Sequence, residues 1–249
     1  MVYFYIIFLI IGIILIIFLV LGLPRKKNAR KPSIEGLDDP EIAKAFEKMT
    51  NLVPFKILRR RILSKLKKYS LEGKLVDLGC GSGNLLILIS KIYPNLKLVG
   101  VDLSSEILEL AKLKARENKL SDNVDFKVGN ADKLPFLDNS VDFIISSLSL
   151  HHWKEPSIVL KEIHRVLKHS GVFMIFDFRR NSRKFFYGLL TFATKVVVPK
   201  ALKKIKEPIG SLQAGYTPIE IKELISDSPF KNEKIEFYLA WMFIKMIKE

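Results

Sequence analysis

A glycine-rich segment is the first candidate for chemistry. Residues 75–85 read LVDLGCGSGNL, an apolar run that leads into three glycines and then a helical pattern. Glycine tolerates positive φ and lets a ligand approach the main chain, and the free N–H groups of the next helix bind polar ligand atoms. The segment predicts a ligand-binding loop at Gly79, Gly81 and Gly83, although a plain strand–helix turn has the same spacing.

The second candidate is Asp102, the last residue of the apolar run that begins at Lys97. A carboxylate at the end of the second strand can accept hydrogen bonds from both hydroxyls of a ribose, as in dinucleotide-binding folds. The alternative is that Asp102 caps the helix expected to begin near Ser104. Because a glycine loop precedes it in the chain, ribose binding is the favoured interpretation.

The glycine spacing separates two classes of cofactor. A dinucleotide fingerprint requires glycine at position 84, where this chain has Asn84. Gly-x-Gly-x-Gly after an acid, here Asp77, instead resembles motif I of the class I S-adenosylmethionine-dependent methyltransferases. In that family the loop surrounds the methionine part of the cofactor. The resemblance therefore implies S-adenosyl-L-methionine as the cofactor, with Asp77 and the three glycines among its binding residues.

Residues 128–132, VGNAD, are followed by LPF at 134–136. This segment resembles the part of the same family that holds the adenine ring. The resemblance implies that Asp132 accepts a hydrogen bond from the exocyclic amine and that Asn130 and Ala131 contact the ring. The alternative is a polar turn before Pro135.

Two further motifs follow: VDFIISSLSLHHW at 141–153 and EIHRVLKHSG at 162–171. Together they resemble the type 11 methyltransferase domain, a group that includes the ubiquinone and menaquinone C-methyltransferases. The resemblance extends over about residues 70 to 180, and residues 168–171 depart from the family's usual Lys-Pro-Gly-Gly turn. It implies that Ser82 and Ser147 also touch the cofactor.

The resemblance implies displacement of a methyl group from a sulfonium donor, which needs mainly proximity and alignment. A general base is needed only if the acceptor holds its proton tightly. Either His151 or His152 can serve, with His151 the named candidate; the alternative is that one packs on Trp153 and the other is solvated. No metal ion is expected. The Asn/Asp-Pro-Pro-Tyr/Phe signature of amino-methyltransferases is absent, which argues against DNA-base amines as acceptors.

The elements that position these residues alternate along the chain. Apolar runs predict strands at 75–78, 97–101, 124–128, 141–146 and 172–176, with helices at 85–93, 105–118 and 156–168 between them. Such alternation predicts an α/β fold with a doubly wound, mainly parallel, Rossmann-like sheet. Lys234–Lys248 is expected to add one or two final strands, for a total of about seven.

The first residues predict a membrane anchor. Val2–Leu23 contains no charge, and eighteen of its residues are Val, Leu, Ile or Phe. As a helix it extends about 33 Å, which matches a hydrocarbon core of about 30 Å. A cleaved signal peptide is the alternative, but its basic start and small-residue cleavage site are missing. We expect residues 1–23 to be a single-pass transmembrane helix.

The rest of the layout follows. Residues 24–37, with Arg25, Lys26, Lys27, Arg30 and Lys31, predict a basic linker, which places the catalytic domain on the cytoplasmic side of the cell membrane. Residues 38–249 are expected to form the methyltransferase domain. Within it, helices at 39–69 and an insert at 179–216 are expected on the acceptor side, and the insert's apolar and lysine residues suit anionic lipid or a lid.

Three functions compete at this level. The anchor and the insert favour methylation of a small, lipophilic or membrane-associated acceptor such as a quinone precursor or a phospholipid headgroup. The net charge of +15 leaves an RNA or protein methyltransferase open, although no RNA-binding module is visible and nucleic acid is an unlikely partner for a tethered enzyme. The third is a non-catalytic, membrane-tethered cofactor-binding module.

Overall fold

The protein is built around one seven-stranded sheet. The computed structural model describes residues 2–22, 25, 28–34, 36–120 and 123–249. The strand order is β3-β2-β1-β4-β5-β7-β6, and only β7 runs antiparallel to its neighbours. The strands are β1 Lys74–Leu78, β2 Lys97–Asp102, β3 Val124–Val128, β4 Val141–Ser147, β5 Leu167–Phe178, β6 Asn232–Phe237 and β7 Trp241–Ile247. The predicted α/β, mainly parallel sheet is confirmed.

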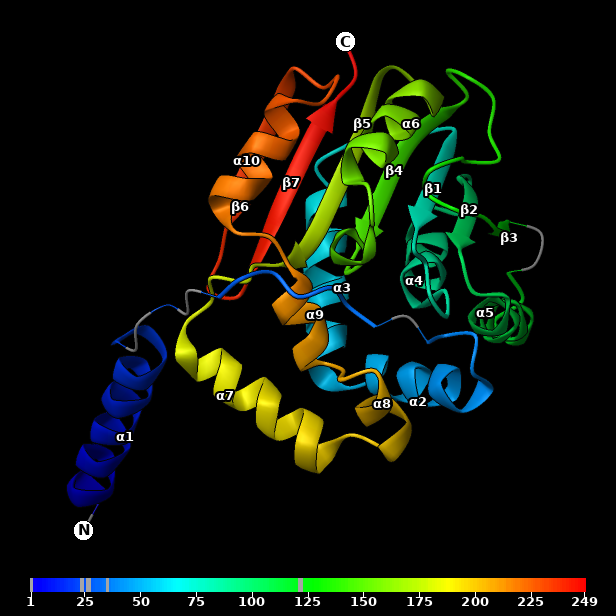
Figure 1. The fold of residues 1–249 in the computed structure, drawn as a ribbon. Coiled ribbons are helices and arrows are strands. Elements are labelled where there is room, and N and C mark those ends of the chain that lie inside the picture. The colour runs from blue at the N-terminus through cyan, green and yellow to red at the C-terminus, as the bar shows by residue number, and fades with distance from the viewer. Residues whose placement is uncertain (1, 23–24, 26–27, 35, 121–122) are drawn as a thin grey trace.

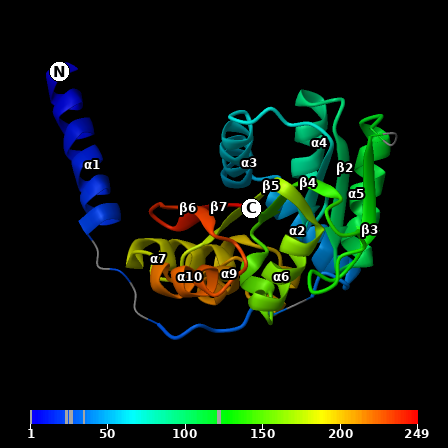
Figure 2. The ribbon, with the colours of Figure 1, turned by 90° about the horizontal axis from the view of Figure 1, so that it is seen from above.

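Helices cover both faces of this sheet (Figures 1 and 2). The helices are α1 Val2–Gly22, α2 Pro40–Thr50, α3 Val53–Leu66, α4 Asn84–Ile92, α5 Ser105–Glu117, α6 Pro156–Val166, α7 Lys184–Phe192, α8 Lys200–Lys204, α9 Ile209–Ala214 and α10 Pro218–Ser226. Two short elements complete the list: the 3-10 turn η1 Leu150–His152 and the π-helix η2 Ala193–Val197.

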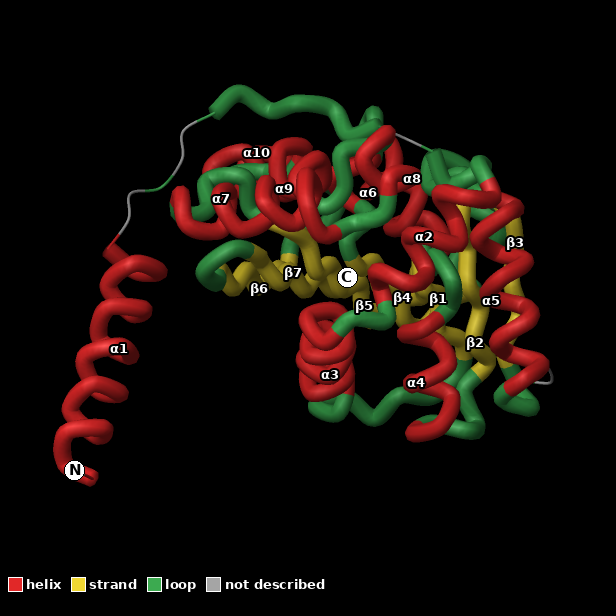
Figure 3. Tube along the Cα trace, turned by 90° about the horizontal axis from the view of Figure 1, so that it is seen from below, coloured by secondary structure: helices red, strands yellow, loops and turns green. Residues whose placement is uncertain are grey.

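The alternation of side chains along the strands divides the core in two. Val76 and Leu78 of β1 pack with α6 and α10, whereas Leu75 faces the cluster formed by α3, α4 and α5. The view from below shows the same two layers, with α3 and α4 on one side of the sheet and α6 and α10 on the other (Figure 3). Burial on both faces explains why these strands are almost uninterrupted apolar runs.

The topology fixes where a ligand can bind. The chain moves outward from β1 to β2 and β3, and then returns to place β4 on the other side of β1. Loops after β1 and β4 therefore diverge, and in open α/β sheets the crevice at this switch point is the usual ligand site. Figure 1 shows β1 and β4 pointing toward the region of α2 and α8.

Local signals set several helix boundaries. Asp39 caps α2 by accepting from the amide of Glu41, and Pro40 occupies the first turn. Thr217 and Glu220 form a capping box at the start of α10. In contrast, α6 ends at Val166 instead of Lys168, because Leu167 already begins β5. The insert at 179–216 contains α7, η2, α8 and α9.

The predicted transmembrane helix coincides with α1, which has 21 residues. Among the described residues, no helix meets the combined length and apolarity needed to cross a membrane. The transmembrane helix is therefore not confirmed. Large hydrophobic side chains at 2–18, apart from Gly12, are exposed, and α1 extends away from the sheet (Figure 1). Leu23, Lys26 and Lys27 lie outside the described residues.

Candidate active site

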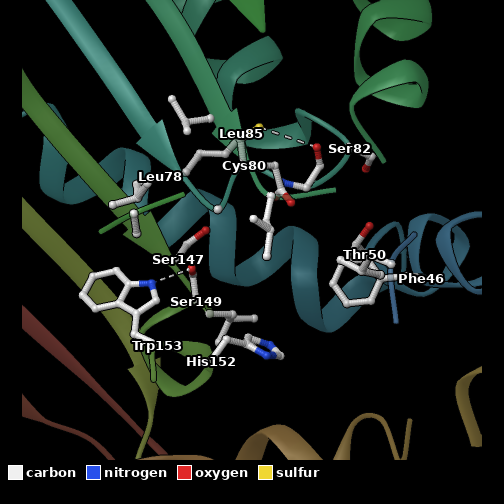
Figure 4. A pocket seen from close by; sticks show the side chains of 18 of the residues that line it. Phe46, Thr50, Leu78, Cys80, Ser82, Leu85, Ser147, Ser149, His152 and Trp153 are labelled. Atoms are coloured by element: carbon white, nitrogen blue, oxygen red, sulfur yellow. Dashed lines mark hydrogen bonds between the residues drawn. The ribbon is translucent and has the colours of Figure 1, made fainter. Parts of the chain in front are cut away.

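One cavity of about 290 Å³ opens at the carboxyl ends of β1, β2 and β4. Its walls include eight residues predicted to bind the cofactor: Gly79, Gly81, Ser82, Asp102, Asn130, Ala131, Asp132 and Ser147. Figure 4 shows the cavity from close by, with Ser82 and Ser147 among the labelled side chains. The structure thus brings together residues from the carboxyl ends of β2 and β4 and from the loops after β1 and β3.

The glycine loop adopts the conformation that its composition predicts. Gly79, Gly81 and Gly83 have φ values of +73°, +53° and +71°, a region that L side chains rarely adopt. A Cβ on Gly79 would lie 2.3 Å from the Ser149 Oγ, and one on Gly83 would lie 3.0 Å from the Phe126 ring. Gly83 caps α4 but does not line the cavity. Only glycine fits this close approach of loop, helix and ring.

Asp102 has a double role at the end of β2. Its Oδ2 accepts from the Gly81 amide at 2.8 Å, and its Oδ1 accepts from the Ser104 amide at 3.2 Å. Burial raises the pKa of this carboxyl, although these backbone hydrogen bonds oppose the rise. Asp102 braces the glycine loop and lines the cavity, so ribose binding stays a prediction, whereas the capping alternative is wrong because Ser104 caps α5.

Asp77 lies beneath the glycine loop and does not line the cavity. It is 1% exposed, and neither carboxylate oxygen has a hydrogen-bond partner among the described residues. Burial, together with the negative charge of Asp102, raises the pKa of Asp77 to about 7. A buried acid without a partner is costly, and a positive charge above the loop would stabilise its ionised form.

Sequence reasoning missed a polar network that ties α2 and α5 to the glycine loop. Lys114 Nζ donates to Ser82 Oγ at 3.2 Å and to Asn84 Oδ1 at 3.0 Å, and it forms an ion pair with Glu47 at 2.5 Å. Asn84 Nδ2 also donates to Thr50 Oγ1 at 3.2 Å. These residues belong to ordinary amphipathic helices, so no local motif distinguishes them from a solvated surface.

The residues predicted to contact the adenine ring lie in an exposed turn after β3. Asn130 Nδ2 donates to Asp132 Oδ2 at 3.2 Å, and the Asp132 amide donates to Asn130 Oδ1 at 3.3 Å. Both side chains are exposed and both line the cavity. The turn is therefore preformed, and its role in holding a ring stays a prediction.

The structure separates the two candidate bases by their position. His151 is 1% exposed and does not line the cavity. Its Nδ1 lies 2.7 Å from Asp177 Oδ1, and its amide donates to Asp177 Oδ2 at 2.9 Å. His152 lines the cavity instead (Figure 4). The backbone of the 3-10 turn η1 places the His152 ring, and not the His151 ring, in the cavity wall. No pattern in the sequence distinguishes the two histidines.

The wall away from the glycine loop is largely apolar. Phe46, Phe55, Leu58, Ile62 and Ile205 contribute to it. Thr50, Arg59 and Glu207 are polar residues of the same lining. Arg59 Nη1 donates to the Thr50 carbonyl at 2.8 Å, and Arg59 Nε has no hydrogen-bond partner among the described residues. Burial lowers the pKa of Arg59. This wall suits a ligand that is mostly apolar with one polar or anionic group.

The residues present fit S-adenosyl-L-methionine. The glycine cradle admits a ligand close to the main chain, Asp102 offers carboxylate oxygens at the cavity wall, and the unpartnered Asp77 favours a cation nearby. The methionine part of this cofactor carries an ammonium and a sulfonium. When bound, the cofactor supplies an activated methyl group.

Comparisons with known proteins agree with this geometry. A family profile described as "Methyltransferase domain" matches residues 76–175. A demethylmenaquinone methyltransferase of Staphylococcus aureus is 28% identical over 208 residues, which cover 79% of this chain and 85% of that protein.

Solved structures share the fold. A SAM-dependent methyltransferase from Aquifex aeolicus superposes with a TM-score of 0.60 at 22% identity, covering 84% of this chain and 98% of that one. A Haemonchus contortus phosphoethanolamine N-methyltransferase 2, crystallised with S-adenosyl-L-methionine, gives a TM-score of 0.64 at 17% identity. That match covers 85% of this chain and 59% of the other.

Proposed function

The chain is a class I S-adenosylmethionine-dependent methyltransferase, and from that premise we propose that it methylates a small, lipophilic acceptor held in a membrane. The observation that carries the proposal is the apolar wall of the cavity, formed by α2 and α3 together with Ile205. The similarity to a demethylmenaquinone methyltransferase supports a reduced quinone precursor as the first acceptor to test.

Helix α3 supports the same acceptor class. Leu52 at its N-cap and Val53 and Ile57 within it are 51%, 66% and 49% exposed, while Phe55 and Leu58 of the same helix line the cavity. The helix thus presents apolar side chains both to the cavity and to its surroundings, where a lipophilic molecule would approach. Arg59 at this wall would bind a polar oxygen of the acceptor.

We assign proton removal to His152. The acceptor atom forms a bond to the methyl carbon as the bond between that carbon and sulfur breaks, and sulfur keeps the electron pair. The acceptor then loses a proton, which His152 accepts from its position in the cavity wall. The remaining residues of the cavity align the acceptor and exclude water.

We also propose that α1 attaches the enzyme to the cell membrane, with the catalytic domain on the cytoplasmic side. The continuous exposed apolar surface of residues 2–18 supports attachment. The insert offers a second contact, since Leu189, Phe192, Val196 and Val197 are each at least 50% exposed and lie near Lys195, Lys200 and Lys203. A full membrane crossing stays a prediction from the sequence.

The acceptor class is tested with purified enzyme, S-adenosylmethionine and a reduced demethylated quinone in phospholipid vesicles. We expect a product heavier by one methyl group, formed by wild type and at least tenfold more slowly by Asp102→Ala. Phosphoethanolamine in place of the quinone is the matched polar acceptor. Methylation of phosphoethanolamine with no methylation of the quinone would contradict the proposed acceptor class.

A further inference from the structure

Several described residues between Asn28 and Leu37 bind the catalytic domain. We call residues 28–37 the strap; residue 35 lies outside the described residues. Arg30 Nε donates to the Ala214 carbonyl at 2.7 Å, Arg30 Nη2 donates to the His151 carbonyl at 3.0 Å, and the guanidinium lies 4.4 Å from the centre of the Tyr216 ring. One side chain thus fixes the start of the strap to the insert and to η1.

Further contacts continue along the strap. Arg180 Nε donates to the Asn28 carbonyl at 2.9 Å, and the Lys31 amide donates to the Gln213 carbonyl at 3.2 Å. At the other end, Ser104 Oγ donates to the Leu37 carbonyl at 2.8 Å. Since the Ser104 amide also donates to Asp102, the strap extends from the insert to the loop that carries the predicted ribose ligand.

The strap also forms part of the cavity. Ile34, Gly36 and Leu37 contribute to its lining. A Cβ on Gly36 would lie 2.6 Å from a methyl carbon of Ile205, so the strap packs closely on the acceptor-side wall. The end of the predicted linker, at Ile34, Gly36 and Leu37, is therefore part of the cavity wall, and no periodicity in the sequence indicates this.

Ser33 makes the contact that bears on chemistry. Its Oγ lies 2.8 Å from His152 Nδ1, and the Ser33 side chain is half-buried. The ring of His152 lies 4.2 Å from that of His151, which Asp177 holds. The His152 imidazole is therefore held by the tilted His151 ring and by a hydrogen bond at Nδ1. A serine hydroxyl can donate or accept, and where it accepts from Nδ1 the proton-accepting nitrogen is Nε2.

We propose that the strap belongs to the active site and that Ser33 is a positioning residue, which accepts a hydrogen bond from Nδ1 of His152 so that Nε2 is the proton-accepting nitrogen. This inference rests on the proposed role of His152 in methyl transfer. Ser33 touches neither of the reacting molecules in this assignment, and it acts through the orientation and tautomer of the ring.

The ring contact is read directly by ¹⁵N NMR of full-length protein labelled in histidine. Four histidines are present, and His152→Asn identifies the signals of His152. At one fixed pH we expect Ser33→Ala to move the two ring signals of His152 while those of His164 and His169 stay in place. Ser33→Thr keeps the hydroxyl and should keep the wild-type signals. Unchanged His152 signals in Ser33→Ala would overturn the proposal.

Turnover supplies the second readout. We expect Ser33→Ala to lower the rate of methyl transfer to lipid acceptor about tenfold, while the KM for S-adenosylmethionine stays within twofold, and Ser33→Thr to restore most of the rate. Ser226→Ala, an exposed serine on α10, is the matched control and should behave as wild type. Equal rates for Ser33→Ala and wild type would refute a positioning role.

The two experiments separate two kinds of failure. A wild-type enzyme that transfers no methyl group to lipid contradicts the proposed function. The NMR comparison still decides the Ser33 contact in that case, because the state of the ring is observed without an acceptor. Moved ring signals support the contact, and unmoved signals overturn it.

Discussion

Replacing Asp77 by asparagine removes a buried carboxyl group whose ionisation the fold opposes. The pKa of Asp77 in the folded protein is about 7, against an ordinary value of 3.8, because burial and the charge of Asp102 disfavour the anion. Since the folded pKa lies above the unfolded one, the stability that the acid contributes is present below pH 3.8 and is lost as pH rises through 7. Asparagine has no such dependence.

The size of the effect follows from that difference. Relative to wild type, the free energy of unfolding of Asp77→Asn should rise by about 1.4 kcal/mol per pH unit between the two pKa values. This amounts to about 2 kcal/mol between pH 5.5 and pH 8, and the difference levels off above pH 8. The pH dependence that comes from all other ionisable groups cancels in this difference, because both proteins contain those groups.

Chemical denaturation of the cofactor-free proteins from pH 5.5 to 8 measures this difference. Glu233→Gln, which removes an exposed carboxyl from the edge strand β6, is the control and should show a flat difference from wild type. A stability difference between Asp77→Asn and wild type that does not change with pH would refute the assigned pKa of the buried acid.

Further consequences concern the cofactor and the strap. Asp102→Ala should bind S-adenosylhomocysteine at least tenfold more weakly in calorimetry, since charge-assisted hydrogen bonds contribute about 1.5 to 3 kcal/mol each; unchanged affinity in a folded variant would rule out the ribose assignment. In a thermal-shift comparison S-adenosylhomocysteine should raise Tm and NAD should not, and the opposite ranking would reverse the cofactor class. A chain that starts at Asn28 should keep wild-type affinity for S-adenosylhomocysteine. A chain that starts at Asp38 should bind it more weakly, because the Leu37 carbonyl no longer accepts a hydrogen bond from Ser104. Equal affinities of the two chains would show that the strap is dispensable for cofactor binding.

The strands and the glycine loop could be predicted because their signals are local. An apolar run that ends in a glycine triplet has few alternatives, and the capping residues Asp39 and Thr217 carry their own side-chain chemistry. The positions of Asp102 and Asn130 at the cavity follow from parallel strands that end at one edge.

Contacts between distant segments could not be predicted in this way. Ser33 and His152 are 119 residues apart, and the strap has neither helical nor strand periodicity. A truncation near Lys31, within the predicted linker at 24–37, would remove Arg30 and its hydrogen bond to the Ala214 carbonyl of the insert. The choice between His151 and His152 depends on a single 3-10 turn, whose neighbours Leu148 and Ser149 give no distinctive pattern.

The most direct test of the function follows a labelled methyl group. Full-length enzyme is incubated with methyl-labelled S-adenosylmethionine and a cell extract, which is then separated into lipid, RNA and protein fractions, with the slower Asp102→Ala variant as the control. The apolar cavity predicts that enzyme-dependent label enters the lipid fraction. Label that enters RNA or protein and leaves lipid unlabelled would contradict a lipophilic acceptor, and no label in any fraction would contradict methyl transfer itself.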